Sequence, residues 1–551
     1  MMKIEPTRRQ LLRALCLGGA AAATTSLVGC GGEGAESGSG AAAAGDPVQG
    51  GDLVIALSYE PDTLNVYATH LMGDVQAFAV EGLLVPNEHM EYIPVLAKEV
   101  PTVENGLIVL HDDDTMDITY NLREGVQWHD GSGELTSADV KATWVALANP
   151  DWTAESKQGV DEIDSIDTPD DYTVVCHYNR QTPDFAQCLF TFGIMPAHLI
   201  EGVDMNDPNG EYNSTMVGTG PYKFVEWVRG DHITLERNED YWGEEGPYLD
   251  TITIRFVTDE NTRINMLKSG EIDFTYGIGF ANYPQVENIE GMVTVANPLN
   301  SWQYVDMNCS VPGLDDVNVR HAISCAIDKQ TLVDELFHGI PTAWHQPWTV
   351  SDPYHVEDFV TEWDYDVDRA KQILDDAGWV EGSDGVREKD GVRLDFVVGC
   401  SSSSVTDEAI QQVLMDSLKE VGINLTAENY AASTWTAMMY DGDYQIGLGR
   451  FITSPGATRT KMYASDGALN RGRWSSPEFD EASHQLDREM DEETRKELVK
   501  KCLEAFDEGM PQVIIYSNAE VDVYTNALQG LKLNPTNMTN FCQSASMWLQ
   551  Q

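Results

Sequence analysis

From residue 51 onward, segments with strand-like and helix-like spacing of apolar residues alternate along the chain. Residues 51–58, GDLVIALS, form a short apolar run that is typical of a strand. Residues 117–128 alternate apolar and polar side chains before a turn at Asp130-Gly131, which predicts a second strand. Residues 74–84, DVQAFAVEGLL, have helical spacing. The alternation predicts a mixed α/β chain.

Several longer segments combine helical spacing with cap residues. Residues 136–150 begin with Thr136 or Ser137 as a cap and end before Pro150, and residues 260–270 end at a glycine. Amphipathic patterns that stop at a glycine predict helices within 317–339, 366–379 and 407–422.

The first 50 residues have a different pattern. Arg8 and Arg9 precede an apolar run that ends in Leu27-Val28-Gly29-Cys30, a layout typical of an export signal. Residues 7–13 resemble the twin-arginine motif, and residues 27–30 resemble the bacterial lipobox, in which the cysteine is acylated and becomes the first residue of the mature protein. A buried alanine-rich helix is disfavoured because only low-complexity sequence follows.

We therefore predict a signal peptide over 1–29, lipidation at Cys30 and a flexible linker over 30–50. No later stretch offers the about 18 apolar residues that a membrane span needs. The body is expected outside the cytoplasm, tethered to the outer face of the cytoplasmic membrane at the cell surface or in the periplasm.

Charge excludes some partners. The chain has 34 Lys and Arg against 90 Asp and Glu, a formal net charge of -56. Nucleic acid is not expected as a partner, because binding it needs clustered positive charge. Cysteines show no zinc-like spacing, and we expect those of the body to be small core residues: Cys176, Cys188, Cys309, Cys325, Cys400, Cys502 and Cys542.

The order of segments resembles the peptide and nickel class of extracellular solute-binding proteins (family 5), the receptor components of ABC importers. Its marks are GGDLVIALSYEPDTLN, YNLREGVQWHDGSGELTSADVKATW, VRHAISCAIDKQTLV and AKQILDDAGW, together with residues 218–274, which begin GTGPYKFVEW. The resemblance runs from about Gly50 to beyond Met510, nearly the whole body.

The resemblance implies a two-lobed, α/β periplasmic-binding-protein fold of type II (cluster C), with hinge strands and an extra inserted domain. It implies a monomer that captures a small solute, peptide-like or other, between its lobes and delivers it to the ABC transporter permease subunits. The expected boundaries are lobe I at 51–83, 213–301 and 505–551, the inserted domain at 84–212, and lobe II at 302–504.

In peptide-binding members, an aspartate four residues before a proline holds the solute's ammonium group. Here Trp435 matches the pocket tryptophan that precedes this segment and Pro455 matches the proline, but Phe451 stands at the aspartate's place, after Arg450. A buried ammonium without a carboxylate is poorly stabilised. Arg450 would instead suit a carboxylate, a phosphate or a ring face, or form a salt bridge of its own.

Other candidates follow from position in such a fold. Tyr67, His70 and Met72 lie in the loop after the first strand, and Trp344 and His345 offer a stacking surface. Each aromatic could equally be a core residue. The complete set of predicted ligand-binding residues is Tyr67, His70, Met72, Trp302, Tyr304, Trp344, His345, Trp435, Arg450, Phe451 and Tyr516.

An enzyme is not expected. The chain has no GxSxG, HExxH or GxxxxGK[ST] motif, so we name no catalytic residue. His70, Met72 and His345 could contact a metal complex, but the histidines show no HxH or HxxxH spacing, and no metal or other cofactor is expected. The alternatives are a surface-anchored hydrolase, or a sensory or chaperone-like lipoprotein on the same fold.

Overall fold

The computed structural model describes residues 45–69, 74–154, 157–188, 193–207, 210–536 and 541–550. The predicted signal with Arg8 and Arg9, the lipidation site Cys30, and the candidates His70 and Met72 lie outside the described residues. Asp46–Gln551 form one compact unit.

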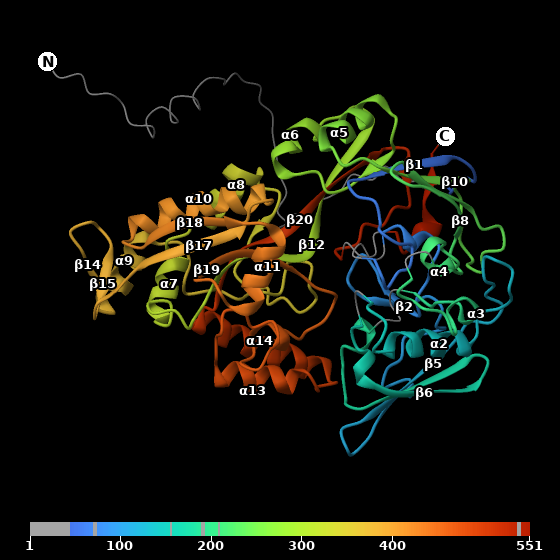
Figure 1. Cartoon of the computed structure of the whole chain (residues 1–551), viewed down its shortest axis with the longest axis horizontal. Helices are drawn as coiled ribbons and strands as arrows, with labels where there is room; N and C mark the ends of the chain where they lie inside the picture. The colour runs from blue at the N-terminus through green and yellow to red at the C-terminus, as the bar shows by residue number, and fades with distance from the viewer. Residues whose placement is uncertain are drawn as a thin grey trace, which may run out of the picture. The chain divides into compact units, whose positions relative to one another are not determined.

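The backbone of the fold is an 11-stranded mixed sheet (Figure 1). Its strands, in spatial order, are β18 (Asn424–Tyr430), β17 (Asp395–Ser401), β19 (Ile446–Ile452), β12 (Met292–Met307), β20 (Gln512–Thr525), β11 (Phe274–Thr275), β1 (Asp52–Leu57), β10 (Thr251–Phe256), β9 (His232–Arg237) and β8 (Tyr222–Val228), with β13 (Thr342–Ala343) paired to β20. The strand predicted at 51–58 is therefore confirmed as β1.

Two long strands join the halves of this sheet. β12 and β20 run antiparallel from the pair Met292 and Thr525 to the pair Asp306 and Gln512. One end of β20 pairs with β11 and the other half of β12 pairs with β19. The register shifts after Pro298, where proline supplies no backbone N–H to the ladder. These are the hinge strands of a two-lobed fold, and Figure 1 shows them passing from β17 and β19 toward β1 and β10.

Each half has its own core. We call lobe I the part packed around β1 and β8 to β11, and lobe II the part packed around β17 to β19. Phe78 and Phe274 lie in the lobe I core, whereas Val305, Ile410 and Leu448 lie in the lobe II core. The residue boundaries expected for the lobes stay predictions.

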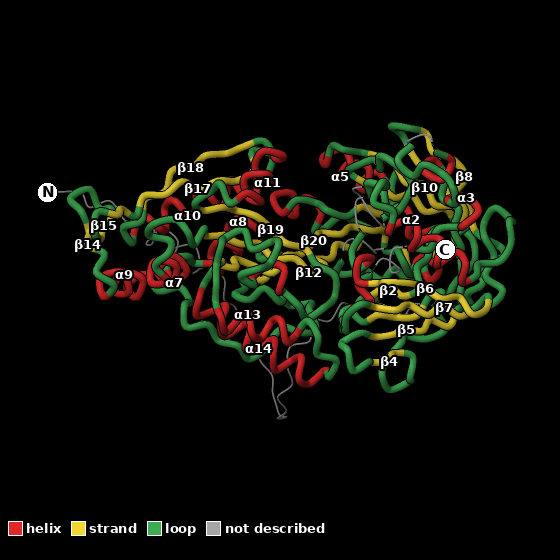
Figure 2. Tube along the Cα trace, turned by 60° about the horizontal axis from the view of Figure 1, so that its bottom comes forward, coloured by secondary structure: helices red, strands yellow, loops and turns green. Residues whose placement is uncertain are grey.

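Helices cover the lobe II sheet and flank lobe I (Figure 2). Those of lobe II are α7 (Val317–Cys325), α8 (Lys329–Phe337), α9 (Val367–Asp376), α10 (Val405–Glu420), α11 (Ala432–Asp441), α12 (Thr460–Tyr463), α13 (Pro477–Leu486) and α14 (Glu492–Gly509). In lobe I, α5 (Glu260–Ser269) has Asp259 as its cap and ends at Gly270, whose φ of 71° is left-handed, as its sequence predicted. α6 (Tyr283–Val286) follows it.

A separate sheet of four strands packs with lobe I. It contains β4 (Ile108–Leu110), β5 (Met116–Asn121), β7 (Thr173–Tyr178) and β6 (Ile163–Asp170) in that order. The predicted helix beside it is confirmed as α2 (Ser137–Ala148), which begins with a capping box between Thr136 and Asp139. The remaining short elements are β2 (Leu84–Pro86), β3 (Tyr92–Pro94), α3 (Ala197–Ile200), α4 (Glu211–Ser214), β14 (Val380–Glu381), β15 (Arg387–Lys389), β16 (Val392–Arg393), β21 (Leu528–Gln529) and β22 (Trp548–Leu549).

The helix predicted over 74–84 is wrong. Only a single 3-10 turn, Gln76–Phe78, forms there. The carbonyl of Ala79 accepts a hydrogen bond from the N–H of Gly220 at 2.9 Å instead of one from the next helical turn. A Cβ on Gly218 would lie 2.0 Å from that carbonyl oxygen, so the glycine turn before β8 allows this close approach. A tertiary contact overrides the local pattern.

Candidate functional site

A cavity of about 520 Å³ lies at the hinge strands and is lined from both lobes. The wall from lobe I is the loop after β11, and the wall from lobe II is the start of α10 together with one end of β19. Its lining residues are Gly277, Ile278, Gly279, Phe280, Leu299, Ser301, Gln303, Ser403, Ser404, Thr406, Asp407, Arg450, Ile452, Tyr516, Asn518, Ala519, Glu520 and Val521. A molecule held there contacts both lobes at once.

Lobe II contributes one positive and one negative side chain. Arg450 is exposed on β19, and Asp407 lies in the first turn of α10. Gln303 Nε2 donates to Asp407 Oδ1 at 2.8 Å, and Ser404 Oγ caps the helix by accepting from the Asp407 N–H at 3.2 Å. Burial raises the pKa of Asp407, while these partners and Arg450 oppose the rise. Lobe II therefore offers an accessible guanidinium.

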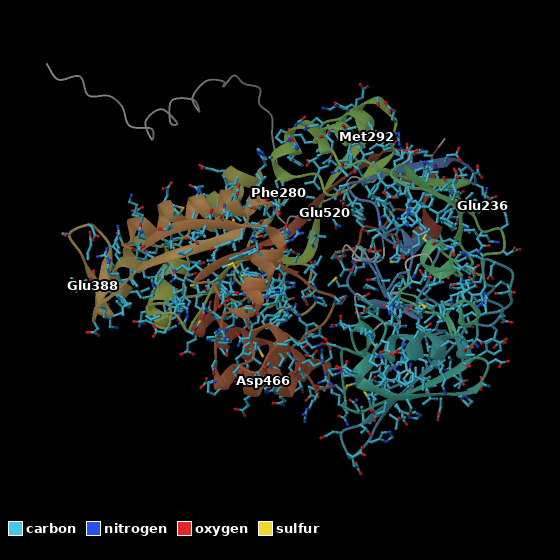
Figure 3. All side chains as sticks on the ribbon, in the orientation of Figure 1. Glu236, Phe280, Met292, Glu388, Asp466 and Glu520 are labelled. Carbon is cyan, nitrogen blue, oxygen red and sulfur yellow. The ribbon has the colours of Figure 1, made fainter. Side chains whose placement is uncertain are left out.

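The hinge side of the cavity is acidic. Glu520 lines it from β20 at the last pairs before the register shift, opposite Asn297 and beside Gly277. Figure 3 labels Glu520 where the hinge strands pass between the lobes. Asp522 is two residues further along the same strand, so both side chains share one face. Both carboxyls interact electrostatically with Asp74.

Asp74 is held by two tyrosines. The hydroxyls of Tyr59 and Tyr276 both donate to Asp74 Oδ2, and the two hydroxyls lie 2.6 Å apart. Burial raises the pKa of Asp74 to about 6, although the two hydrogen bonds lower it. We call Asp74, Glu520 and Asp522 the acidic cluster.

The acidic cluster is short of donors. No donor reaches Asp74 Oδ1, Glu520 Oε2 or either oxygen of Asp522 within the part of the chain that the structure describes. Asp522 is completely buried and Asp74 is 7 % exposed. Burial, and then the neighbouring carboxyls, raise the pKa of both Glu520 and Asp522, whereas Arg450 lowers that of Glu520. These groups cannot all ionise without a positive partner.

Of the residues predicted from sequence, Arg450 and Tyr516 line this cavity. Trp302, Tyr304 and Phe451 do not, because side chains alternate along a strand and these three pack in a second hydrophobic cluster on the opposite face of β12 and β19. The centroid of the Phe451 ring lies 5.5 Å from the centroid of the Trp302 ring and 5.1 Å from that of the Tyr304 ring. The structure thus brings these three together as one packed aromatic group behind Arg450.

Trp435 is also buried, on α11. Its ring stacks on Tyr430 at 5.9 Å and its Nε1 donates to the carbonyl of Leu448 at 3.2 Å. A Cβ on Gly399 of β17 would lie 2.5 Å from the indole, so the ring presses on the sheet. Trp435 packs beneath lobe II strands and does not line the hinge cavity.

The other described candidates stand elsewhere. Trp344 and His345 line a hollow of about 300 Å³ within lobe II beside Lys329, and burial lowers the pKa of His345. Tyr67 is fully buried in lobe I, and its hydroxyl donates to the carbonyl of Gly193. The ligand-binding role of all these residues stays a prediction.

Sequence reasoning missed the acidic cluster and Asp407. A signal was present: Glu520 and Asp522 interrupt an otherwise largely apolar strand at a spacing of two, which places two acids on one buried face. Because the chain has 90 Asp and Glu residues, this spacing alone did not distinguish Glu520 and Asp522 from the other acidic residues.

Further hollows lie away from the hinge. One of about 660 Å³ is lined by α13, α14 and Arg320 of lobe II. Another, of about 410 Å³, lies where loops of the four-stranded sheet meet lobe II, near Arg495 Nη2 and Asp184 Oδ1, which are 2.5 Å apart. Among the described helices, none combines the length and apolar character needed to cross a membrane.

Comparison with known proteins gives consistent matches. The model of the family described as bacterial extracellular solute-binding proteins, family 5, matches residues 91–472. The oligopeptide-binding protein AppA of Bacillus subtilis is 28% identical over 428 residues, which cover 75% of each chain.

Solved structures show the same architecture. The structure of AppA from Bacillus subtilis with a nonapeptide has a TM-score of 0.73 at 24% identity, covering 92% of this chain and 100% of that one. The structure of NikZ from Campylobacter jejuni with Ni(L-His) has a TM-score of 0.74 at 23% identity, covering 90% and 99%. At this identity the likeness shows the two-lobed fold, as the sequence predicted.

Proposed function

Because the chain belongs to the family of bacterial extracellular solute-binding proteins, family 5, we propose that it captures its solute in the hinge cavity and delivers it to an ABC importer permease. The observation that supports this location is the lining of the cavity from both lobes at the register shift of the hinge strands. A solute that touches both lobes binds the closed arrangement more tightly and shifts the population toward it. The permease then recognises the closed form.

The solute is a small molecule with a group that suits a guanidinium. Arg450 lines the cavity and is exposed, so it is available to a carboxylate or phosphate. Relatives bind peptides or a nickel complex according to their names. A peptide-like solute that presents its carboxylate to Arg450 fits both the family and the cavity.

Binding rather than catalysis is the proposed activity. The two carboxyls that line the cavity are Asp407 on lobe II and Glu520 on the hinge strand β20, so their separation changes when the lobes move. A hydrolase that uses a carboxyl pair needs a fixed separation. A surface hydrolase and a sensory or chaperone-like lipoprotein stay as alternatives.

We further propose that the mature protein is a monomer tied to the outer face of the cytoplasmic membrane. Arg8 and Arg9 would direct export and Cys30 would carry the lipid. Labelling with a radioactive fatty acid in the producing cell tests this, since Cys30→Ser should remove the label and release the protein from the membrane.

The deciding experiment is native mass spectrometry of residues 46–551, which form one compact unit, after soaking in growth-medium extract. A receptor retains one solute per chain and releases it on denaturation with its mass unchanged. A hydrolase releases altered fragments. If a ladder of short peptides is released, the protein is a general peptide receptor, and Phe451 in place of the aspartate does not keep it from binding ordinary peptides. If nothing is retained, the proposed function fails.

A further inference from the structure

We propose that the acidic cluster of Asp74, Glu520 and Asp522 is a subsite for a positively charged organic group of the solute, an ammonium or a guanidinium. This inference rests on the proposed function and adds to it the charge class of the solute. It places the recognition of positive charge on the hinge strand β20 and lobe I.

The acidic cluster has more hydrogen-bond acceptors than the described residues around it have donors for them. Four carboxylate oxygens of the cluster receive no hydrogen bond from the described part of the chain. Asp522 has both of its oxygens in this state while being completely buried. Buried polar groups of proteins are nearly always paired, because an unpaired one loses its hydration without compensation. An ammonium brings three N–H donors and a guanidinium five, so either group can supply the donor that Glu520 Oε2 lacks within the described structure.

The charges around the acidic cluster also favour a bound cation. Glu520 and Asp522 lie on one face of β20, and Asp74 interacts with both. The hydroxyls of Tyr59 and Tyr276 donate to Asp74, and Tyr524 interacts electrostatically with Asp522; none of the three tyrosines brings a positive charge. Arg450 is the one described cation that acts on Glu520, and it stands on lobe II and also acts on Asp407. A cation between the carboxyls removes their mutual repulsion.

A solute in the hinge cavity can reach the acidic cluster at Glu520. Glu520 lines the hinge cavity, and Gly277 beside it presents no side chain: a Cβ there would lie 3.4 Å from Glu520 Oε1. Asp522 follows Glu520 by two residues on the same face of β20, and neither Asp522 nor Asp74 lines the cavity. A cationic group that enters past Gly277 therefore contacts Glu520 and acts on the other two carboxyls through their electrostatic interaction with Glu520.

Together with Arg450, the cluster makes the cavity bipolar. Arg450 contributes a positive charge from lobe II, and Glu520 contributes a negative one at the hinge. A solute with both an anionic and a cationic group satisfies both, which also draws the lobes together. The absent aspartate at the place of Phe451 is then compensated from the other side of the cleft.

The test uses matched probes: tri-alanine with N-acetyl-tri-alanine, and butylguanidine with the uncharged butylurea. Dissociation constants are measured by calorimetry for residues 46–551, and the solute captured from growth-medium extract is treated in the same way. We expect the charged member of at least one pair to bind about tenfold more tightly or better than its neutral partner. Glu520→Gln should remove this preference.

Glu236→Gln is the matched control. Glu236 is an exposed glutamate of β9, labelled in Figure 3, and its substitution removes the same charge far from the hinge cavity. The preference for the charged probe should be unchanged in this variant. Asp522→Asn should weaken binding of the charged probe as well, although it touches the cavity only through Glu520.

Proton release gives a second measurement. Because the cluster holds protons when free, a cation that binds there expels about one proton, seen as a dependence of the binding enthalpy on the buffer. Glu520→Gln should reduce this release and Glu236→Gln should not. A protein whose acidic cluster is only structural would show neither effect.

The outcomes separate this inference from the proposed function. If neutral members bind as tightly as charged ones, or the captured solute has no cationic group, the subsite is overturned while solute capture stands. If the charged solute binds equally well to Glu520→Gln, or if a free metal ion alone occupies the cluster, the subsite is likewise overturned. If no probe binds and nothing is captured from extract, both proposals fail.

Discussion

Two buried acidic sites of lobe I have opposite surroundings. Glu81 is 8 % exposed and receives three hydrogen bonds: its Oε1 accepts from the Tyr241 hydroxyl, and its Oε2 accepts from Thr219 Oγ1 and Trp242 Nε1, each at 2.9 Å. In the acidic cluster Asp74 and Asp522 are also buried and Glu520 is half-buried, but four of the oxygens have no donor in the described part of the chain.

The difference separates a structural acid from a binding one. At Glu81 the three donors come from the turn before β8 and the loop after β9, so the carboxylate ties the irregular segment after Gln76–Phe78 to the rest of lobe I. At the acidic cluster four oxygens lack donors among the described residues, and Glu520, which carries one of them, lines the hinge cavity. An unpaired acceptor that lines a cavity can be paired by a hydrogen-bond donor of a bound ligand.

The largest expected effect is at Glu81. Glu81→Ala leaves the hydroxyls of Thr219 and Tyr241 and the indole N–H of Trp242 without their acceptor, so we expect the free energy of unfolding to fall by about 3–5 kcal/mol. Urea unfolding at pH 7 measures it.

Glu81→Gln is the control, because one amide oxygen can still accept from Thr219 and Trp242 while the Tyr241 hydroxyl turns to accept from the amide N–H. It should lose about 1 kcal/mol. Equal losses in both variants would contradict a role based on hydrogen bonding, and no loss in either would end the contrast with the acidic cluster.

The next effect is the pH dependence that Asp74 gives to stability. Its pKa rises from 3.8 to about 6 in the fold, so the folded state holds the proton more tightly than the unfolded chain does. This contribution is complete below pH 4 and is lost as the pH rises from about 4 to about 6, and it amounts to about 3 kcal/mol.

Asp74→Asn should remove that part of the fall, since the amide oxygen keeps accepting from Tyr59 and Tyr276. The measurement is the difference in unfolding free energy between the variant and the wild type at pH 4 and pH 7. Parallel curves would show that Asp74 titrates normally, and the cluster would then carry no excess of protons for a solute to displace.

Sequence alone predicted the parts of this fold that are set locally. α2 begins at its predicted cap and α5 ends at its predicted glycine, because Thr136 and Gly270 act within one turn. The segment 74–84 failed because its backbone is bonded to Gly220, far along the chain. The same limit applies to the site: Arg450 and Tyr516 were found through family position, whereas Asp74 meets Asp522 only through the fold.

A smaller effect of opposite sign is expected at Asp522. Asp522→Asn removes a carboxyl that burial and two like-charged neighbours disfavour, so the free energy of unfolding at pH 8 should rise by about 1–2 kcal/mol. Chemical unfolding at pH 8 without added solute measures it.

Glu236→Gln, at an exposed position, should leave stability within about 0.5 kcal/mol. A loss of stability in Asp522→Asn would show that this carboxylate is already satisfied by the protein. The distinction from Glu81 would then disappear.

The smallest expected effect is at Arg450, the cation on the other side of the cavity from the acidic cluster. The side chain is exposed, so Arg450→Ala should leave the free energy of unfolding within about 0.5 kcal/mol. Its effect should appear in selectivity: the wild type should bind the captured solute about fivefold more tightly with a free carboxylate than as its amide, and the variant should lose this preference.

Arg488→Ala, at another exposed arginine away from the hinge cavity, is the matched control and should keep the preference. If Arg450→Ala keeps it too, the guanidinium serves only to balance Asp407 and Glu520, whose pKa values it lowers. In that event the loss of Arg450 should instead tighten the binding of the cationic probes, because the acidic cluster would then face the cavity without a competing positive charge. The change in affinity for the cationic probes therefore shows whether Arg450 recognises an anionic group of the solute or only lowers the pKa values of Asp407 and Glu520.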